Sequence, residues 1–439
     1  MVGFRTNTSF RLPGEPVNLL VLCPHFDPDV APTGVVMSRI AHELVDRGHR
    51  LHVVTSLPWY QHHAIDPGWD GQLVRTERTE WGRISRVHPF PTDKRNIPAR
   101  ALAFGGFTAL ATLVGTFSRV RPDAVLAMSP PLTLGMAGRV AATARRVPLV
   151  FNIQDVFPDV AIELGLLTGE RVIRGARALE RVSYRMSDAV TVLSDDLADN
   201  VRAKITIGLE GERAAVQAAK VRVIPNFVDT NAIRPSAREN SYREQYGLIG
   251  KTVVMYAGNV GFSQSLDLVL DAARTFQRTR PDVVFVINGG GSARPDLERQ
   301  AAELPNVRFI DMQPIERLPE VLAAGDIHVV PLRAGLAWSS VPSKLYSILA
   351  AGRPIVASVD AGTEVARTIE RAGAGLAVPP DSPVEFRGAL AELLDDRDRS
   401  DQMGASGRLF VERWASPAAV AESYENLFAE LIERRHSRR

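Results

Sequence analysis

The sequence predicts an α/β protein made of two doubly wound domains. Short apolar runs alternate with longer amphipathic segments along both halves of the 439-residue chain. The apolar runs are nearly continuous, which is typical of parallel strands that helices cover on both faces. A stretch with two prolines near the middle, Val221–Ser236, breaks this alternation and is expected to join the domains.

The first half supplies the elements of an N-terminal domain at residues 17–228. Five apolar runs are expected to be strands: VNLLVLC, LHVVTS, AVLAMS, LVFNIQ and AVTVLS. Three longer amphipathic segments between them are expected to be helices: VVMSRIAHELVDRG, LTLGMAGRVAATARR and RVIRGARALERVSYRMS. Strands and helices in this order build a parallel sheet with crossover helices.

The alternation restarts in a C-terminal domain at residues 236–410. Its expected strands are TVVMYAG, VVFVING, VRFIDM, IHVVPL and PIVASV. Its expected helices are LDLVLDAARTFQRT, DLERQAAEL, IERLPEVLAAG and SKLYSILAAG. A final helical segment, residues 411–435, is expected to return and pack on the first domain. Ligands of such sheets bind beyond the carboxyl ends of the strands, so two facing domains would enclose a cleft.

Composition excludes several classes of protein. A net charge of +2 does not favour binding to nucleic acid. The single cysteine, Cys23, rules out an internal disulfide framework and suits a reducing compartment. Because Cys23 lies in an apolar run, we expect it in the core rather than at a reactive site. The N-terminal residues lack the apolar stretch of a signal peptide, which favours a cytoplasmic location.

One uncharged segment needs its own explanation. Residues 101–118, ALAFGGFTALATLVGTFS, are long enough for a transmembrane candidate. Their place within the strand–helix alternation favours a buried helix, and a helix lying on a membrane surface is the main alternative. Trp59, Tyr60, Trp69 and Trp81 precede the segment and suit either a membrane interface or a pocket for an acceptor.

Three short stretches in the second half suit an anionic ligand. AGNVG (Ala257–Gly261) and NGGGS (Asn288–Ser292) each follow a strand, and glycines there let backbone amides approach a phosphate. Neither matches a nucleotide-binding fingerprint, so an ordinary strand-to-helix turn is the favoured interpretation of each stretch by itself. In VPSKLYSILAAGRPIVAS, Ser343 suits a helix N-cap and places Lys344 in the first turn. A cation there opposes the helix dipole, which suggests that an anion binds between them; a solvated surface lysine is the alternative that the pattern leaves equally open.

The last stretch resembles the donor-binding segment of retaining GT-B glycosyltransferases of family 4. The colanic-acid and O-antigen branch of that family is the most similar. Further resemblances follow in chain order: RGHRLHVVT, SPPLTLG, QDVFPD, IPNFVD, AGNVGFSQSLDLVLDAA and GTEVARTIERAGAGLAVPPDS. Together they cover nearly the whole chain and imply the GT-B fold, with two Rossmann-like domains.

The resemblance implies transfer of a hexosyl or N-acetylhexosaminyl group from a nucleotide sugar, with UDP as the expected nucleotide. The acceptor would be a lipid-linked saccharide of a cell-surface polysaccharide, met at the inner face of the cytoplasmic membrane. No metal is expected, because Lys344 and Arg333 would stabilise the departing diphosphate. The resemblance gives the other donor-side residues as Gly34, Gly258, Asn259, Gly261, Gly289, Gly290, Ser343, Leu345, Ser347 and Glu364.

The chain also departs from the family pattern. Asn259, Phe262 and Ser263 stand where many members carry a basic pair, and serines stand in place of two glutamates. Of these, Ser347 replaces the glutamate that binds ribose, so Glu364 is expected to substitute for it. Gln154 and Asp155 are the acceptor-side candidates. Asp27 and Asp29 form a DxD pattern in which a metal role is not expected, and His25, His62 and His63 suit surface or acceptor-loop roles.

Two other functions stay open at this stage. The missing basic pair and glutamates are compatible with a catalytically silent subunit that binds a sugar nucleotide. The two-domain architecture is shared by sugar-nucleotide 2-epimerases. Transfer or hydrolysis of a donor would separate the first alternative from a transferase, and an epimerised donor would identify the second.

Overall fold

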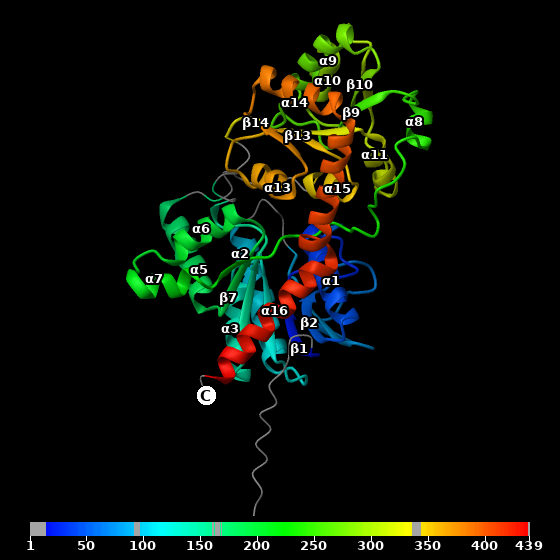
Figure 1. Cartoon of the computed structure of the whole chain (residues 1–439). Coiled ribbons are helices and arrows are strands. Elements are labelled where there is room, and N and C mark those ends of the chain that lie inside the picture. Colours follow the sequence, from blue (N-terminus) through cyan, green and yellow to red (C-terminus); the bar gives the residue numbers. More distant parts are fainter. Residues whose placement is uncertain are drawn as a thin grey trace, which may run out of the picture. The chain divides into compact units, whose positions relative to one another are not determined.

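The computed structural model describes residues 15–91, 97–159, 162, 167, 169–335 and 344–437, with 97–101 as backbone alone. The chain divides into two compact units (Figure 1). The first comprises Met1–Asn226 with Val420–Arg439, and the second comprises Phe227–Ala419. Each unit is built on one sheet, as the alternation of strands and helices predicted.

The first unit contains an eight-stranded sheet in the order β3-β4-β2-β1-β5-β6-β7-β8. All its neighbours are parallel except the β3–β4 pair. The strands are β1 (Asn18–Leu22), β2 (Arg50–Ser56), β3 (Val74–Thr79), β4 (Gly82–Val87), β5 (Ala124–Ser129), β6 (Leu149–Ile153), β7 (Ala189–Val192) and β8 (Val221–Val223).

Two parts of this sheet differ from the sequence-based expectation. The β3–β4 hairpin was not predicted, because β3 is a polar edge strand whose residues alternate between exposed and half-buried positions. The expected linker, Val221–Ser236, was predicted to begin too early. Its first three residues form β8, because Val221 is buried and pairs with Val190.

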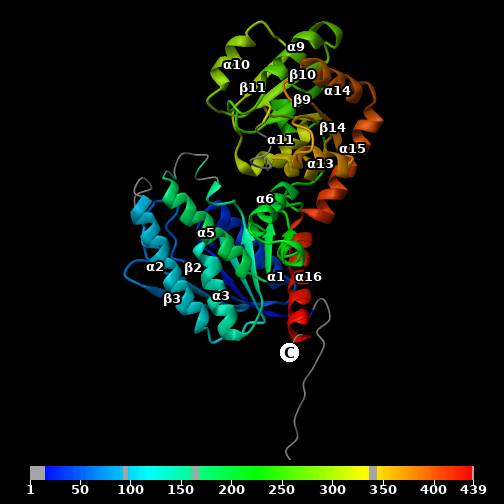
Figure 2. The ribbon, with the colours of Figure 1, turned by 90° about the vertical axis from the view of Figure 1, so that its left-hand side faces the viewer.

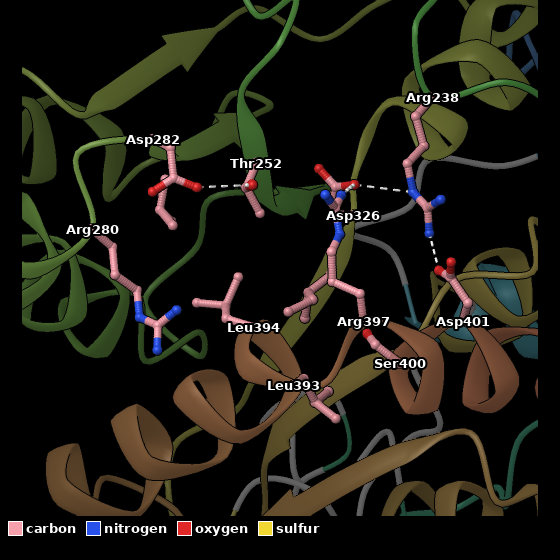
Figure 3. Close-up of a pocket in the computed structure, with 12 residues that line it drawn as sticks. Arg238, Thr252, Arg280, Asp282, Asp326, Leu393, Leu394, Arg397, Ser400 and Asp401 are labelled. Carbon is pink, nitrogen blue, oxygen red and sulfur yellow. Dashed lines mark hydrogen bonds and ion pairs between the residues drawn. The ribbon is translucent and has the colours of Figure 1, made fainter.

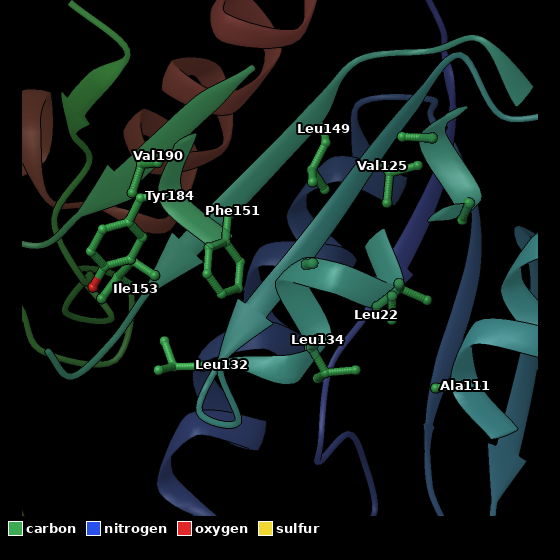
Figure 4. Packing of buried hydrophobic residues seen from close by; sticks show 14 of the residues in the cluster. Leu22, Ala111, Val125, Leu132, Leu134, Leu149, Phe151, Ile153, Tyr184 and Val190 are labelled. Atoms are coloured by element: carbon green, nitrogen blue, oxygen red, sulfur yellow. The ribbon is translucent and has the colours of Figure 1, made fainter. Parts of the chain in front are cut away.

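Helices cover both faces of this sheet. They are α1 (Pro32–Asp46), α2 (Ile97–Thr116), α3 (Thr133–Arg145), α5 (Glu170–Met186), α6 (Asp195–Ile205), α7 (Gly211–Ala218) and α16 (Pro417–His436). Figure 4 shows the core of this unit, in which the Phe151 ring lies 6.4 Å from the Tyr184 ring between centroids and Leu22 belongs to the same cluster. Helix α16 packs on the other face, where the Tyr424 hydroxyl accepts a hydrogen bond from the Asn152 amide at 2.9 Å.

The uncharged segment 101–118 forms most of α2, and only one side of it is buried. Phe107 and Ala111 lie in the core, whereas Leu102 and Leu113 are exposed. The expectation of a buried helix is therefore right for one face alone. Among the described helices, none is long and apolar enough to cross a membrane. Cys23 is buried as expected, and desolvation raises its pKa to about 12.

The second unit contains a six-stranded, fully parallel sheet in the order β11-β10-β9-β12-β13-β14. This is the strand order of a Rossmann fold, in which the order of the strands reverses between β9 and β12, the topological switch point. The strands are β9 (Thr252–Ala257), β10 (Val283–Asn288), β11 (Val307–Ile310), β12 (Ile327–Pro331), β13 (Ile355–Ser358) and β14 (Gly375–Val378).

Besides a 3-10 turn at Ile315–Arg317, eight α-helices accompany this sheet in the described residues of the second unit. They are α8 (Ser241–Gln245), α9 (Asp267–Thr279), α10 (Arg294–Gln300), α11 (Leu318–Ala324), α12 (Lys344–Ala350), α13 (Glu364–Ala372), α14 (Pro383–Asp395) and α15 (Arg397–Trp414). Helix α15 stays with this unit because Gly407 packs closely on Leu349 of α12. The return to the first unit therefore begins at Val420, later than the expected residue 411.

Candidate active site

Two glycine-rich loops meet at the carboxyl edge of the second sheet. The Gly258 amide donates to the Asn288 carbonyl at 3.0 Å, and the Val260 amide donates to the Gly290 carbonyl at 2.8 Å. Gly289 has φ +156°, and a Cβ there would lie 1.9 Å from the Gly258 carbonyl oxygen. Glycine is thus required for this close approach, while a Cβ on Gly290 would meet no atom within 4 Å. Backbone hydrogen bonds therefore join the two glycine loops closely, while the side of the second loop at Gly290 is open.

Lys344 begins α12 and reaches this loop pair. Its Nζ donates to the Tyr256 hydroxyl at 2.9 Å and to Gln264 Oε1 at 2.8 Å. It also lies 4.2 Å from the centre of the Tyr256 ring. A Cβ on Gly258 would lie 3.7 Å from this nitrogen, so the ammonium faces the first glycine loop.

The electrostatic setting of Lys344 is unusual. No carboxylate among the described residues pairs with its Nζ, and burial lowers its pKa to about 7. A buried ammonium without an opposite charge is costly, and a neutral hydroxyl and amide offset that cost incompletely. A bound anion would remove the deficit. The arrangement therefore suits a phosphate or diphosphate ligand.

A cavity of about 200 Å³ adjoins Lys344. Its polar lining consists of Lys344, Ser347, Gly258, Asn288 and Gln313. Its apolar lining comes from β9, from the segment after β11 and from α11, and comprises Ala257, Met312, Ile315, Leu318, Val321 and Leu322. Met312 and Ile315 are both largely exposed. Sequence reasoning missed these two, and the missed signal was an apolar pair directly after a strand, at the edge where ligands bind.

Several predicted donor-side residues have other partners. The Arg333 guanidinium donates to the Phe262 carbonyl at 2.9 Å and pairs with Asp267 at 3.0 Å. Glu364 is buried and accepts from Arg371 at 3.0 Å and from Arg367 at 3.3 Å, both on its own helix.

Neither Arg333 nor Glu364 lines the cavity. The Leu345 side chain is fully buried in the core, so it could serve a donor through its backbone alone. Asn259 and Gly261 belong to the first glycine loop beside Lys344. Ser343 lies outside the described residues.

The first unit has its own polar cluster at the carboxyl ends of β1 and β2. His25 Nδ1 lies 2.7 Å from Asp29 Oδ2, and the Tyr60 amide donates to Asp29 Oδ1 at 3.3 Å. The Trp59 ring stacks on the His25 ring at 5.8 Å between centroids, and the Tyr60 ring meets it edge-on at 5.4 Å. Adjacent parallel strands end at the same edge, which explains why residues 34 positions apart meet here.

Gly34 positions that cluster. A Cβ on Gly34 would lie 2.7 Å from the Cβ of His25, so a larger residue in α1 would displace the imidazole. Asp29 is 3% exposed, and its carboxylate fixes which ring nitrogen of His25 faces it. His25 Nε2 makes no hydrogen bond to another described residue and can meet a ligand hydroxyl.

The acceptor-side candidates Gln154 and Asp155 follow β6 on the same edge. The Gln154 amide is already engaged, because its Nε2 donates to Asn152 and its Oε1 accepts from Asn226 at 3.0 Å. Asp155 remains exposed, and partial desolvation raises its pKa. The structure thus gives Gln154 a structural role, while contact of either residue with an acceptor stays a prediction.

A second cavity of about 120 Å³, shown in Figure 3, lies at the amino ends of β9 and β12. Asp326 pairs there with Arg238 at 3.0 Å and with Arg397 at 3.1 Å. This is the edge opposite to the one where ligands bind in such sheets, and its charges compensate one another. We interpret it as a structural ion-pair network. Among the described residues, no cluster of histidine, cysteine, aspartate or glutamate could hold a metal ion.

Comparison with known proteins agrees with this architecture. Residues 33–226 match the family model "Glycosyl transferase 4-like domain", and residues 251–396 match "Glycosyl transferases group 1". WcaI of Escherichia coli K12, a glycosyl transferase named for colanic acid biosynthesis, is 28% identical over 378 residues, covering 83% of this chain and 89% of WcaI.

Two solved structures share the fold. Sucrose-phosphate synthase from Thermosynechococcus elongatus superposes with a TM-score of 0.65 at 16% identity, covering 95% of this chain and all of that one. Anabaena HepE in complex with UDP gives 0.59 at 15% identity, covering 94% and 100%. The two family models span most of the chain and both units. The protein therefore belongs to the family 4 glycosyltransferases of the GT-B fold, in the colanic-acid and O-antigen branch.

Proposed function

We propose that this protein transfers a hexosyl or N-acetylhexosaminyl group, with retention, from a UDP-sugar to a lipid-linked saccharide in cell-surface polysaccharide biosynthesis. The observation that carries the proposal is the ammonium of Lys344, a half-buried residue whose charged form is disfavoured by desolvation. It faces a glycine loop beside a partly apolar cavity and has no carboxylate partner among the described residues. A nucleoside diphosphate offers both the missing negative charge and a flat, partly apolar base.

Lys344 would act on the leaving group. As the glycosidic bond breaks, negative charge grows on the diphosphate oxygen, and a fixed cation in a poorly hydrated site stabilises that charge. Attraction that strengthens toward the transition state raises turnover as well as affinity. With this charge in place, we propose that the reaction needs no metal ion. Arg333 remains a predicted second cation, and in the described structure it holds the first glycine loop through Phe262.

The rest of the nucleotide is assigned from the cavity lining. Met312 and Ile315 would contact the base, and Ser347, one turn after Lys344, would reach the ribose. Binding of UDP by HepE, a protein of the same fold, supports uridine as the nucleoside.

The acceptor is assigned to the cluster of His25, Asp29, Trp59 and Tyr60. Aromatic rings present apolar faces to the C–H faces of sugars, and an imidazole nitrogen accepts a hydrogen bond from a hydroxyl. A saccharide offers both partners. The relation to WcaI supports an acceptor in polysaccharide assembly. Such acceptors grow on lipid carriers, so we propose that the protein works at the inner face of the cytoplasmic membrane.

The test is a donor screen with the purified chain. UDP-glucose, UDP-N-acetylglucosamine and GDP-mannose are compared by thermal stabilisation, since a bound donor raises apparent stability. Hydrolysis of the stabilising donor is then followed with and without a lipid extract as acceptor. A donor that binds without being turned over would indicate a silent subunit. NMR detection of an epimerised donor would indicate an epimerase.

A further inference from the structure

The outer surface of α2, α3 and α5 carries mainly apolar and basic side chains, rather than a mixture of polar side chains with both charges. Helix α3 packs against α2 on one side and α5 on the other, so the three helices form one layer (Figure 2). A surface helix of a globular protein normally turns a polar face to water. Helix α2 does not, and this exposed apolar surface requires a partner.

The apolar part of the surface runs along α2 and α3. On α2 the exposed residues recur at helical spacing, which places them on one face: Leu102, Gly105, Ala109, Leu113 and Phe117 just beyond its end. Leu102 is 80% exposed and Phe117 is 77% exposed. Met136 and Val140 continue the apolar surface on α3, one turn apart and both exposed. Contiguous exposure of this kind marks an interaction site.

The basic part lies on α5. Arg171, Arg174 and Arg177 are exposed, and neither Arg171 nor Arg177 makes a hydrogen bond or ion pair with another described residue. Acidic residues on the three helices are limited to Glu170 and Glu180. Glu180 is buried and bonds to Lys204, so it does not neutralise the outer surface. The layer therefore presents arginines next to apolar side chains with almost no negative charge.

We infer that the outer surface of α2, α3 and α5 docks on an anionic lipid bilayer. Leucine and phenylalanine side chains enter the boundary between headgroups and acyl chains, while arginines bind lipid phosphates. A second copy of this chain fits the surface less well. A two-fold interface would bring the arginines of one copy against those of the other, and like charges repel.

This surface deepens the proposed function, because a lipid-linked acceptor would be reached at the membrane. Its basis is separate, since the residues lie on helices that contribute nothing to the cavity beside Lys344. Not every apolar side chain of α2 can serve to test this surface. Phe107 is 3% exposed and lies in the core, so its substitution would unfold the first unit rather than probe the surface.

The experiment measures co-sedimentation of the full chain with phosphatidylcholine vesicles that contain or lack phosphatidylglycerol. We expect binding to the anionic vesicles alone, weakening as salt is raised. Arg171→Gln with Arg177→Gln should lower the partition coefficient about 25-fold, at about five-fold per arginine. Leu113→Gln with Phe117→Gln should lower it at least about tenfold.

Matched controls separate the surface from general effects. Ile249→Gln with Val384→Gln removes two equally exposed apolar side chains from the second unit, and Arg299→Gln removes an exposed arginine there. Neither should change vesicle binding. Calorimetry with UDP should give wild-type affinity for every variant. A wild-type chain that binds UDP but no anionic vesicles overturns this surface and leaves the proposed function intact.

Three results would overturn the inference. The first is a wild-type chain that does not co-sediment with anionic vesicles. The second is equal loss of binding in the surface variants and in their controls. The third is light scattering that shows a dimer which Leu113→Gln with Phe117→Gln converts to monomer, because the surface would then be covered by a second copy.

Discussion

The two sheets place different chemistry at equivalent positions. In the second unit, the edge at the switch point between β9 and β12 holds the half-buried ammonium of Lys344, whose described partners are a hydroxyl and an amide. In the first unit, the carboxyl end of β1 holds His25, whose ring is paired with the buried carboxylate of Asp29. One site lacks a negative charge, and the other already has one.

This difference indicates what each site can bind. An uncompensated cation favours an anion, because the ligand then replaces the solvation that burial removed. A histidine already paired with a carboxylate favours neutral hydroxyls, since the pair needs no further charge and a second anion would be repelled. The difference supports the proposed placement of the nucleotide diphosphate in the second unit and of the saccharide acceptor in the first.

The largest effect is expected at Lys344. Lys344→Met keeps the volume of the side chain and removes its charge, so turnover at saturating donor should fall about 100- to 1,000-fold. Steady-state transfer assays measure this, and circular dichroism checks folding. Lys251→Met serves as a control because Lys251 is exposed. Normal turnover with a raised Michaelis constant would mean that Lys344 binds the ground state and the transition state equally well. That result would weaken the contrast drawn between the two sites.

The next effect is expected at the first unit's site. His25→Gln and Asp29→Asn should each lower transfer to acceptor by about ten- to a hundred-fold, the cost of losing a charged hydrogen bond, while donor hydrolysis and UDP affinity stay unchanged. His62→Gln is the matched control. His62 also pairs with an aspartate four residues on, Asp66 at 3.0 Å, but its side chain is 60% exposed. An equal loss in this control would remove the acceptor role from His25.

A smaller effect, on stability rather than on UDP affinity, is expected at Glu364. The sequence predicted a ribose contact for Glu364, but the structure shows it buried among Arg367, Arg371 and Thr368. Glu364→Gln should therefore lower the free energy of unfolding by about 1–3 kcal/mol and leave UDP affinity unchanged. Urea unfolding and calorimetry measure the two quantities. A ten- to hundred-fold loss of UDP affinity in a stable variant would restore the ribose contact.

The smallest effect is a pH dependence of stability. Lys344 has a pKa of about 7 in the folded protein and an ordinary value of 10.5. The unfolded chain thus binds more protons above pH 7, and the stability of the ligand-free protein should rise with pH. This group adds up to about 1.4 kcal/mol per pH unit between about pH 7 and 9. Urea unfolding of Lys344→Met should give a flatter profile, and identical profiles would contradict the low pKa.

The fold was largely predictable from the sequence because its signals are local. Continuous apolar strands and amphipathic helices appear within short windows, and they placed most strands of both sheets. The β3–β4 hairpin escaped because Val74–Thr79 is polar and lies at an edge. The late return of the chain escaped because packing of Gly407 on Leu349 is a long-range contact that periodicity does not encode.

The candidate site was predictable only in part. Lys344 and the glycine loops stood out because they break local rules for helices and strands. Tyr256, Gln264, Met312 and Ile315 did not stand out in the sequence. Contacts between loops that follow different strands bring them to Lys344 and its cavity. The cluster around His25 was hidden in the same way, because Trp59 and Tyr60, which contact the His25 ring, follow a neighbouring strand. The sequence thus identifies residues that break local patterns, whereas the order of the strands determines which of these residues come into contact.

The most direct test of the central claim is proton uptake when UDP binds. Calorimetry at about pH 8, in buffers with different ionisation enthalpies, measures the protons taken up with each UDP. At this pH Lys344 is mostly neutral in the free protein, and a bound diphosphate should raise its pKa and restore its charge. We predict uptake of about one proton by the wild type and none by Lys344→Met. Equal uptake by the two proteins would show that the diphosphate does not bind at Lys344.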